Sequence, residues 1–320
     1  MPVLPRFANA YMIIYNGFQD KRLKPRPRCV ALGVFDGVHL GHQKILNEII
    51  RTAAKKNWAS TVVTFDPDPS RVLRPEKRHP ILISLEHRLR FFAKMGIEET
   101  LVITFDKKFS KISHKTFLEN FLLRHLGMRF LAVGNDFCFG YQGLGNTGYL
   151  GEKSRALSFQ FHQVSPLRKN GQVVSSTKIR RLVERGKLRK AARMLGRPVS
   201  VYGQVIRGRG RGQRTGFPTA NLDPHHETLP PSGVYAAWGL WRKKKLKAVV
   251  HIGKRPTFSD KEKSLEAHFL NFHKNIYGEE IELFFVKKLR VIKRFKSPKM
   301  LAGAIAADMR KALQSLSDQV

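Results

Sequence analysis

The chain has 320 residues, 42% of them hydrophobic, and is therefore long enough for two domains that each bury a core. Its 59 lysines and arginines against 24 aspartates and glutamates give a formal net charge of +35, which attracts nucleic acid, anionic membrane surfaces and phosphorylated small molecules alike. Two distant cysteines, Cys29 and Cys138, exclude a disulfide framework, and no apolar stretch approaches the roughly 18 residues that a membrane helix needs. We therefore expect a cytoplasmic protein with no membrane partner.

The first predicted elements alternate between strands and helices. After a first strand in "YMIIYNG", the segment from Cys29 to about Val164 contains the strands "CVALGVF", "STVVTF", "ETLVITF" and "RFLAVG". Between them lie segments with apolar residues at helical spacing, "GHQKILNEIIRTAAKK", "LEHRLRFFAKMG" and "KTFLENFLLRHLG". This order is typical of βαβ units around a parallel sheet, so we expect a doubly wound α/β domain.

The pattern changes near Ser175. Two short helices, "SSTKIRRLVERG" and "KLRKAARMLG", each end at a glycine. Beyond Arg197 the segments are short and β-like: "VYGQVI", "GVYAAWGL", "KAVVHIG", "LEAHFLNF" and "IELFFVKKLRVI". They predict a small β-barrel or sandwich, followed by a helix from Pro298 to Leu316. We place the domain boundary between Gly186 and Val201.

The stretch "GVFDGVHLGH", Gly33 to His42, joins the second strand to the first helix. In a βα unit a ligand lies at the carboxyl end of the strand, against the positive end of the following helix. Gly41 would let a phosphate approach the backbone there. His39 and His42 would then donate hydrogen bonds to a triphosphate and stabilise charge that develops on its α-phosphate. The alternative is that both are surface or metal-binding histidines.

A second phosphate-binding pattern is "SSTKIR", Ser175 to Arg180. Its serines and threonine are suited to cap a helix, and Lys178 and Arg180 place cations close to that helix's N-terminus. Taken alone, the segment could equally be an ordinary capped basic helix.

The stretch "GQVIRGRGRGQRTGFPTANL" combines glycines and arginines in a way that also suits an RNA-binding segment. Phe217, Pro218 and Leu222 are packing residues, however, which favours a glycine loop over phosphates. The hydroxyl of Thr219 and the amide oxygen of Asn221 are ligands that a partly hydrated Mg²⁺ accepts. The alternative for "PTAN" is a plain β-turn with a capping asparagine.

Glu266 lies within the apolar strand "LEAHFL". Strand alternation places Glu266, His268 and Leu270 on one face. A carboxylate there is costly to bury without a purpose, which marks Glu266 as a candidate catalytic group. The alternative is an exposed residue paired with a lysine.

These motifs resemble the bacterial bifunctional riboflavin kinase/FMN adenylyltransferases, also called FAD synthetases. "GVFDGVHLGH", "VVTFDPDPSRVL", "VGNDFCFG" and "SSTKIR" follow the order of the family's nucleotidylyltransferase module, and "TGFPTANL", "GVYAAW", "GKRPTF" and "YGEEIELFF" that of its kinase module. The resemblance implies a Rossmann-like nucleotidylyltransferase domain with a parallel sheet over residues 11–190. It also implies a small β-barrel riboflavin kinase domain with a terminal helix over residues 197–320.

The resemblance further implies phosphorylation of riboflavin to FMN with ATP and Mg²⁺, and adenylylation of FMN to FAD with release of pyrophosphate. In the kinase step Glu266 would take the proton of the ribityl 5′-hydroxyl, with Thr219 and Asn221 as metal ligands. In the adenylyl step His39 and His42 would act on the ATP phosphates, and Asp136 and Phe137 would bind the flavin. The implied ATP-binding residues are Gly33, Phe35, Asp36, Gly41, Asp136, Ser176, Thr177, Arg180, Gly208, Gly216, Thr219 and Asn221.

One departure from the family concerns Asp68, which stands where the family usually has histidine. A carboxylate close to ATP phosphates repels them, so one alternative is a riboflavin kinase with an impaired adenylyltransferase half. Another alternative, favoured by the charge of +35 alone, is a basic nucleic-acid-binding protein. Because two separate phosphate motifs match one family, we expect flavins and ATP as ligands rather than nucleic acid.

Overall fold

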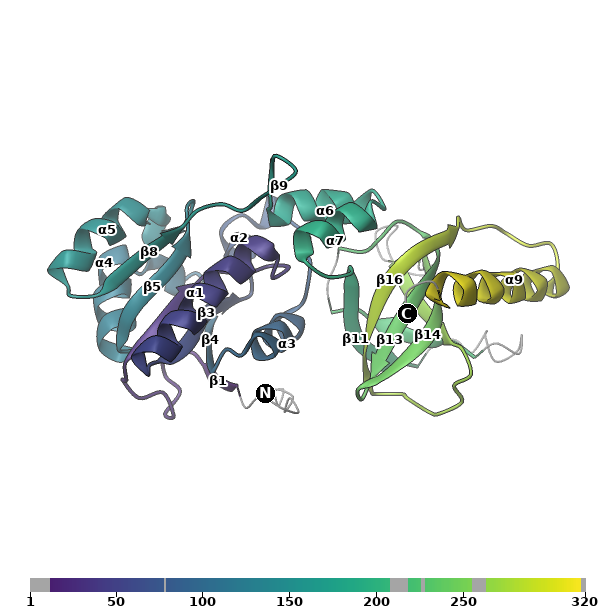
Figure 1. The fold of residues 1–320 in the computed structure, drawn as a ribbon, viewed down its shortest axis with the longest axis horizontal. Coiled ribbons are helices and arrows are strands. Elements are labelled where there is room, and N and C mark those ends of the chain that lie inside the picture. Colours follow the sequence, from purple (N-terminus) through teal and green to yellow (C-terminus); the bar gives the residue numbers. More distant parts are fainter. Residues whose placement is uncertain (1–11, 78, 208–217, 226–227, 255–262, 318–320) are drawn as a thin grey trace. The chain divides into compact units, whose positions relative to one another are not determined.

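The computed structural model describes residues 12–77, 79–207, 218–225, 228–254 and 263–317. The chain forms two compact units, which are described separately (Figure 1). The first contains the chain up to His79 together with Leu85–Ser176. The second contains Pro80–Ser84 and the chain from Thr177 onward.

A six-stranded parallel sheet forms the centre of the first unit, in the order β1-β4-β3-β2-β5-β8. All five residues of β2 and the first six of β3 are buried, because helices cover the faces of a parallel sheet. The strands are β1 Ile13–Asn16, β2 Arg28–Leu32, β3 Ala59–Asp66, β4 Glu99–Thr104, β5 Met128–Gly134 and β8 Gln160–Val164.

The helices of this unit follow the predicted apolar spacing. Helix α1 packs on β2, β3 and β5 through Ile45, Leu46, Ile49 and Ala53. The predicted helix "KTFLENFLLRHLG" begins as α4 but continues as a π-helical stretch, η3, in which the amide of Leu126 donates to Phe121 O at 2.9 Å. The longer helices are α1 Leu40–Lys56, α3 Leu85–Met95, η3 Phe117–His125, which continues from the single turn α4 His114–Thr116, and α5 Thr147–Ala156.

Several short elements lie in the connections of the first unit. Each has two to five residues, too few to show a periodicity, and the sequence patterns did not predict them. They are α2 Pro69–Leu73, η1 Pro75–Lys77, η2 Phe109–Lys111, η4 Tyr141–Gly143, and the strand pairs β6 Cys138–Phe139 with β7 Gly145–Asn146 and β9 Arg168–Lys169 with β10 Gln172–Val173.

A closed antiparallel barrel forms the second unit, in the order β11-β12-β15-β14-β13-β16. Its strands are β11 Ser200–Ile206, β12 Ala220–Asp223, β13 Gly233–Trp241, β14 Lys244–Lys254, β15 Lys263–Phe269 and β16 Glu280–Arg290. Two helices precede it, α6 Ser176–Glu184 and α7 Leu188–Leu195, and the glycines that follow them, Gly186 and Gly196, have positive φ as helix ends require.

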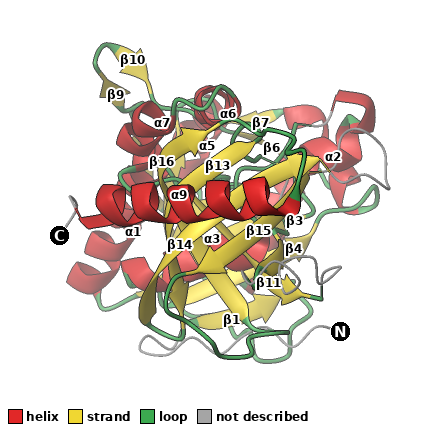
Figure 2. Ribbon diagram, turned by 90° about the vertical axis from the view of Figure 1, so that its right-hand side faces the viewer, coloured by secondary structure: helices red, strands yellow, loops and turns green. Residues whose placement is uncertain are grey.

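The last helix, α9 Pro298–Ser317, crosses the barrel strands (Figure 2). It packs on β13, β14 and β16, where Ala312 and Leu316 join a core with Val234, Ala236 and Val249. The structure thus confirms the predicted fold, a parallel α/β unit followed by a small barrel and a terminal helix. Among the described residues, no helix combines the length and apolar character required to cross a membrane.

Candidate functional site

The parallel sheet has a switch point beside β2. From β2 the chain proceeds through β3 to β4 on one side and then returns to β5 on the other side of β2. Ligands of such sheets bind at the carboxyl ends of the strands where the order reverses. The histidine loop follows β2, and the segment with Asp136 and Phe137 follows β5. The topology therefore brings two of the predicted segments to one edge of the sheet.

His39 is the N-terminal cap of α1, and its Nδ1 accepts a hydrogen bond from the His42 amide at 3.2 Å. A ring nitrogen that accepts carries no proton, so in the neutral ring the proton of His39 is on Nε2. The two imidazoles stack with centroids 3.6 Å apart, and His39 is 5% exposed. The structure thus brings both predicted histidines together at the first turn of the helix.

The loop before the histidines has an unusual backbone. Phe35, Gly37 and Val38 all have positive φ, and for the β-branched Val38 this conformation is strained. The buried Phe35 ring meets the edge of His42 at 5.3 Å and of Phe92 at 5.9 Å. Its side chain therefore supports the loop from inside.

Gly41 is required by the position of His39. A Cβ at residue 41 would lie 3.1 Å from Cε1 and 3.2 Å from Nδ1 of the His39 ring, closer than side chains normally approach. The space beside Gly33 is less restricted, since a Cβ at residue 33 would lie 3.4 Å from the Phe35 ring, an ordinary contact distance. The absence of a side chain at Gly41 thus allows the His39 ring to lie close to the helix backbone. This is in addition to the access for a phosphate that the sequence predicts.

Ser176 connects the second phosphate motif to this loop. Its hydroxyl donates to the backbone carbonyl of Asp36 at 2.8 Å, and Asp36 is itself buried. The following residues of α6, Thr177 and Arg180, belong to the second compact unit. Thr177 is exposed, and Arg180 lies half-buried one helical turn further on.

At the end of β5, Asp136 is exposed and Phe137 is half-buried. The Phe137 ring stacks on Phe139 at 5.6 Å, with an interplanar angle of 15°. An exposed carboxylate beside a stacked aromatic pair is suited to a planar heterocycle with hydrogen-bond donors.

Asp68, which departs from the family pattern, has a local structural use. Its Oδ1 accepts from the amide of Ser70 at 2.8 Å and from the Ser70 hydroxyl at 2.7 Å, so it caps the short helix α2. Burial raises the pKa of the neighbouring Asp66, although the charge of Arg88 opposes this. The turn after β3 therefore carries two carboxylates close to a buried cation.

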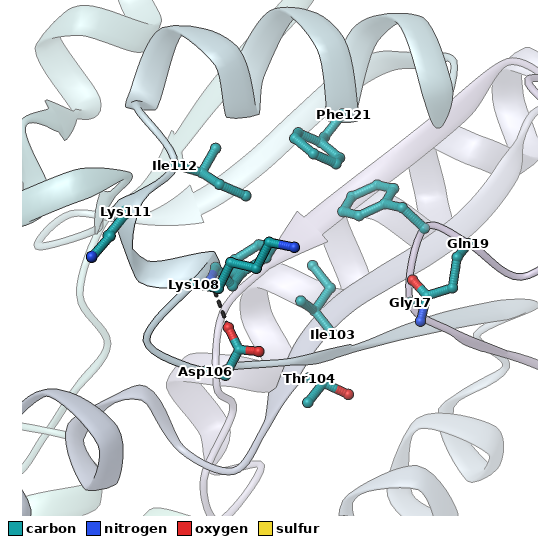
Figure 3. A pocket seen from close by; sticks show the side chains of 11 residues that line it. Gly17, Gln19, Ile103, Thr104, Asp106, Lys108, Lys111, Ile112 and Phe121 are labelled. Atoms are coloured by element: carbon teal, nitrogen blue, oxygen red, sulfur yellow. Dashed lines mark hydrogen bonds between the residues drawn. The ribbon is translucent and has the colours of Figure 1, made fainter.

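A cavity of about 680 Å³ lies at the carboxyl ends of β1 and β4 (Figure 3). Phe18, Phe109 and Phe121 form its apolar walls, with Lys108 lying across it. None of the site residues predicted from the sequence lines it. The Phe117 ring contacts both Phe109, which lines this cavity, and Phe139 of the aromatic pair after β5. Sequence patterns did not reveal the cavity, because its lining residues come from strand ends and connections that are far apart in the chain.

A second cavity, of about 260 Å³, lies between the barrel strands and α9, and Thr219, His251, Glu266 and His268 are among the residues that line it. Asn221 is the cross-strand neighbour of Glu266 on β12, and His251 is its neighbour on β14. The structure therefore brings the predicted base and the predicted metal ligands together. Asn221 lies in a strand, so the alternative of a plain β-turn is wrong at that residue.

The strand of the predicted base ends sooner than expected. Glu266 and His268 share the cavity face, but β15 ends at Phe269. Leu270 follows the end of the strand and lies buried in a core cluster with Val234 and Val249, two residues that line the same cavity, and its amide donates to Lys247 O at 2.9 Å. It therefore keeps to the predicted side of the barrel, although the strand has ended.

An ion pair closes one side of the barrel cavity. Arg290 Nε lies 3.0 Å from both carboxylate oxygens of Asp308, which α9 contributes and which is 3% exposed. Burial is the main cause that lowers the pKa of His251, and the nearby Glu266 opposes it. The lowered pKa favours the uncharged imidazole of His251 beside Glu266 at neutral pH.

Two predicted ATP-binding residues, Gly208 and Gly216, lie outside the described residues. Within the described part of the chain, no three His, Cys, Asp or Glu side chains cluster as metal ligands. The oxygen donors of Thr219 and Asn221 still fit Mg²⁺, which binds through few protein ligands together with phosphates and water.

Comparisons with known proteins agree for both units. Family models described as FAD synthetase and riboflavin kinase match residues 21–178 and 195–316. A bifunctional riboflavin kinase/FMN adenylyltransferase of Buchnera aphidicola is 34% identical over 302 residues, 93% of this chain and 97% of the relative. One from Escherichia coli K12 is 33% identical over 299 residues, 93% and 96%. A solved structure described as a macrolide-efflux protein from Streptococcus pneumoniae has a TM-score of 0.79 and 26% identity, and the match covers 93% of this chain and 98% of that one.

Proposed function

Since the chain belongs to the bifunctional riboflavin kinase/FMN adenylyltransferase family, we propose that the barrel cavity is its kinase site and the histidine loop its adenylyltransferase site. The chain has both activities and makes FMN and FAD, as predicted. The observation that carries the assignment is the clustering of Glu266, Thr219 and His251 around one cavity in the barrel. The histidine pair stands at the switch point of the other unit.

In the kinase step, Glu266 accepts the proton of the ribityl 5′-hydroxyl while that oxygen attacks the γ-phosphorus of ATP. Thr219 and Asn221 hold Mg²⁺, which when bound neutralises charge on the phosphates. The apolar side chains Val234, Val249 and Ile305 line the same cavity and exclude water from the reacting atoms.

In the adenylyl step, a phosphate oxygen of FMN attacks the α-phosphorus of ATP and pyrophosphate leaves. No protein nucleophile is needed, because positioning and electrostatic stabilisation suffice. The Nε2 proton of His39 and the imidazole of His42 stabilise the charge on the phosphates. Asp136 and Phe137 bind the flavin, while Ser176 supports the Asp36 backbone. Thr177 and Arg180 keep the phosphate-binding roles that the family resemblance implies.

Three finer points belong to the same proposal. The functional domains extend over residues 11–190 and 197–320. Mg²⁺ is the metal of both reactions, and the ligands are riboflavin, FMN, FAD and ATP rather than nucleic acid. The enzyme works in the cytoplasm, where its nucleotide substrate is made.

The substitution His42→Asn tests the adenylyltransferase site. With riboflavin, ATP and Mg²⁺, the variant is expected to accumulate FMN and to form FAD about 100-fold more slowly, the usual cost of losing one transition-state donor. The flavins are separated by chromatography. His125→Asn, which replaces an exposed histidine of the same unit, serves as the control. Undiminished FAD formation by His42→Asn would contradict the assignment.

A further inference from the structure

Arg88 is a buried cation beneath the adenylyltransferase site, to which the sequence patterns assigned no role. It lies in α3 and is 4% exposed. Its Nη1 donates to the carbonyl of Val34 at 2.5 Å and to the hydroxyl of Thr64 at 3.1 Å, and its Nη2 donates to the carbonyl of Phe65 at 3.3 Å. One guanidinium thus holds the ends of two strands, β2 and β3.

The acceptors of Arg88 are the last residues before the functional loops. Val34 immediately precedes the segment from Phe35 to His42, and Phe65 immediately precedes the turn with Asp66 and Asp68. Two further bonds join the same strand ends. The Thr64 hydroxyl donates to the Val34 carbonyl at 3.2 Å, and the Gly33 amide donates to Val63 O at 3.1 Å.

Helix α3 touches the histidine loop at a second point. Phe92, one helical turn after Arg88, packs edge-on against the Phe35 ring, which in turn meets His42. The two residues share a face of the helix because they are four positions apart. Helix α3 therefore contacts the strained loop twice. Arg88 donates hydrogen bonds at the start of the loop, and Phe92 packs on the Phe35 ring inside it.

Arg88 also sets the charge at this edge of the sheet. Burial lowers the pKa of Arg88, and the carboxylates of Asp36, Asp66 and Asp68 oppose this because they favour its charged form. Without the cation, these three carboxylates would stand together where a triphosphate has to bind. A buried guanidinium with fixed donors suits this place better than a flexible ammonium group.

We infer that Arg88 is a positioning residue of FMN adenylylation: it fixes the histidine loop against the Asp66–Asp68 turn and offsets the carboxylates that would repel ATP. The inference rests on the proposed function of the histidine loop. Arg88 acts through backbone groups and neighbouring charges, and no contact of its own with substrate is required.

Three single variants test the inference in the full-length enzyme. Arg88→Met is expected to lower kcat for conversion of FMN to FAD about 100-fold, as a displaced catalytic loop does, and to raise KM for ATP. Arg88→Lys should recover part of both, because it keeps the charge but offers its donors from a single nitrogen. The matched control Lys94→Met removes an exposed cation from the same helix and should change neither parameter.

Formation of FMN from riboflavin shows that the other unit, which holds the kinase cavity, is intact, and circular dichroism shows whether the unit with Arg88 is folded. Arg88→Met should retain FMN formation within about twofold. If Arg88→Met fails to fold, Arg88→Lys carries the test. The inference is overturned if the folded variants keep kcat and KM for FMN adenylylation.

A double-mutant cycle separates positioning from a merely structural role. Asp68→Asn keeps the cap of α2, since asparagine also accepts from the Ser70 amide, but removes one carboxylate. Added to Arg88→Met or Arg88→Lys, it should lower KM for ATP towards that of the wild type, whereas in the wild type it should have little effect. If the effects of the Arg88 and Asp68 substitutions on KM for ATP were additive, Arg88 would not act by offsetting the charge of Asp68. If instead His42→Asn leaves FAD formation intact, the site assignment itself fails.

Discussion

At His39, one backbone hydrogen bond decides which ring nitrogen carries the proton. The His42 amide donates to Nδ1, so the neutral ring carries its proton on Nε2, the atom that we expect to donate to a phosphate. The residue types of this loop were predictable, because a glycine-separated histidine pair after a strand has a recognisable chemistry. The hydrogen bond that selects the tautomer was not, since it depends on His39 standing at the helix cap.

Substitution of Gly41 tests how closely that imidazole has to be held. In Gly41→Ala, the new methyl group would press on Cε1 and Nδ1 of His39, and the ring would have to shift by a few tenths of an ångström. We expect kcat for FAD formation to fall roughly tenfold, while FMN formation stays unchanged. Steady-state kinetics of the two half-reactions measure both. Gly151→Ala is the control, because its methyl group would meet only one atom at ordinary contact distance. Equal FAD rates for both variants would contradict this role of Gly41.

Arg88 shows what a residue-by-residue interpretation misses. In the sequence it stands among Leu89, Phe91 and Phe92, and the segment was predicted as an ordinary amphipathic helix. An arginine four residues before a core phenylalanine was the available signal, since a long cation seldom lies on a core face without partners. Its acceptors, Val34 and Phe65, become neighbours only when β2 and β3 pair.

At the scale of elements, Glu99 joins four strands of the parallel sheet. This fully buried carboxylate on β4 accepts from Arg28 Nε at 2.6 Å, from the Thr61 hydroxyl at 2.8 Å and from the Tyr15 hydroxyl at 3.0 Å. These partners come from β2, β3 and β1. The exposed end of Arg26 adds a further bond at 2.7 Å. Hydrogen bonds to one buried carboxylate thus stabilise the pairing order of the strands, in addition to apolar packing.

Glu99→Gln should destabilise the first unit by about 3–5 kcal/mol, because it leaves Arg28 buried without its counter-charge. Burial alone would raise the pKa of Glu99, but Arg28, Thr61 and Arg26 together hold it below its ordinary value of 4.5. The stability it contributes is therefore present above pH 4.5 and is lost as the pH falls through the lower pKa of the folded state. Urea unfolding between pH 3 and pH 7 measures this. A variant as stable as the wild type at neutral pH would contradict the role of Glu99.

The long elements were predictable because their apolar spacing repeats over several turns or strand pairs. Helix α1 and strand β3 lie where the pattern placed them. The π-helical hydrogen bonds of η3 were not predictable, because the apolar spacing of a short segment does not distinguish the two kinds of turn. Strand β12 was also missed, since its four residues follow a stretch of glycine and proline.

For the whole molecule, the change of pattern near Ser175 predicted two domains with different architectures, and the switch from a parallel sheet to an antiparallel barrel confirms that change. Among the anionic partners that the charge of +35 left open, family membership supports the flavin and nucleotide substrates, since both family models concern flavin chemistry. Asp68, the reason to consider an impaired adenylyltransferase half, is used as a helix cap beside a buried arginine. We therefore expect the wild-type chain to complete both steps.

The proposed function implies that the two steps take place at separate sites and that FMN passes from one to the other as a free product. The most direct test mixes two full-length variants, Glu266→Gln, which lacks the base of the kinase step, and His42→Asn, which lacks a phosphate contact of the adenylyl step. With riboflavin, ATP and Mg²⁺, the account predicts little flavin product from the first alone, FMN from the second alone, and FAD from the mixture. If folded Glu266→Gln failed to convert supplied FMN to FAD, if folded His42→Asn failed to form FMN, or if the mixture stopped at FMN, the claim would be contradicted; circular dichroism shows that both variants are folded.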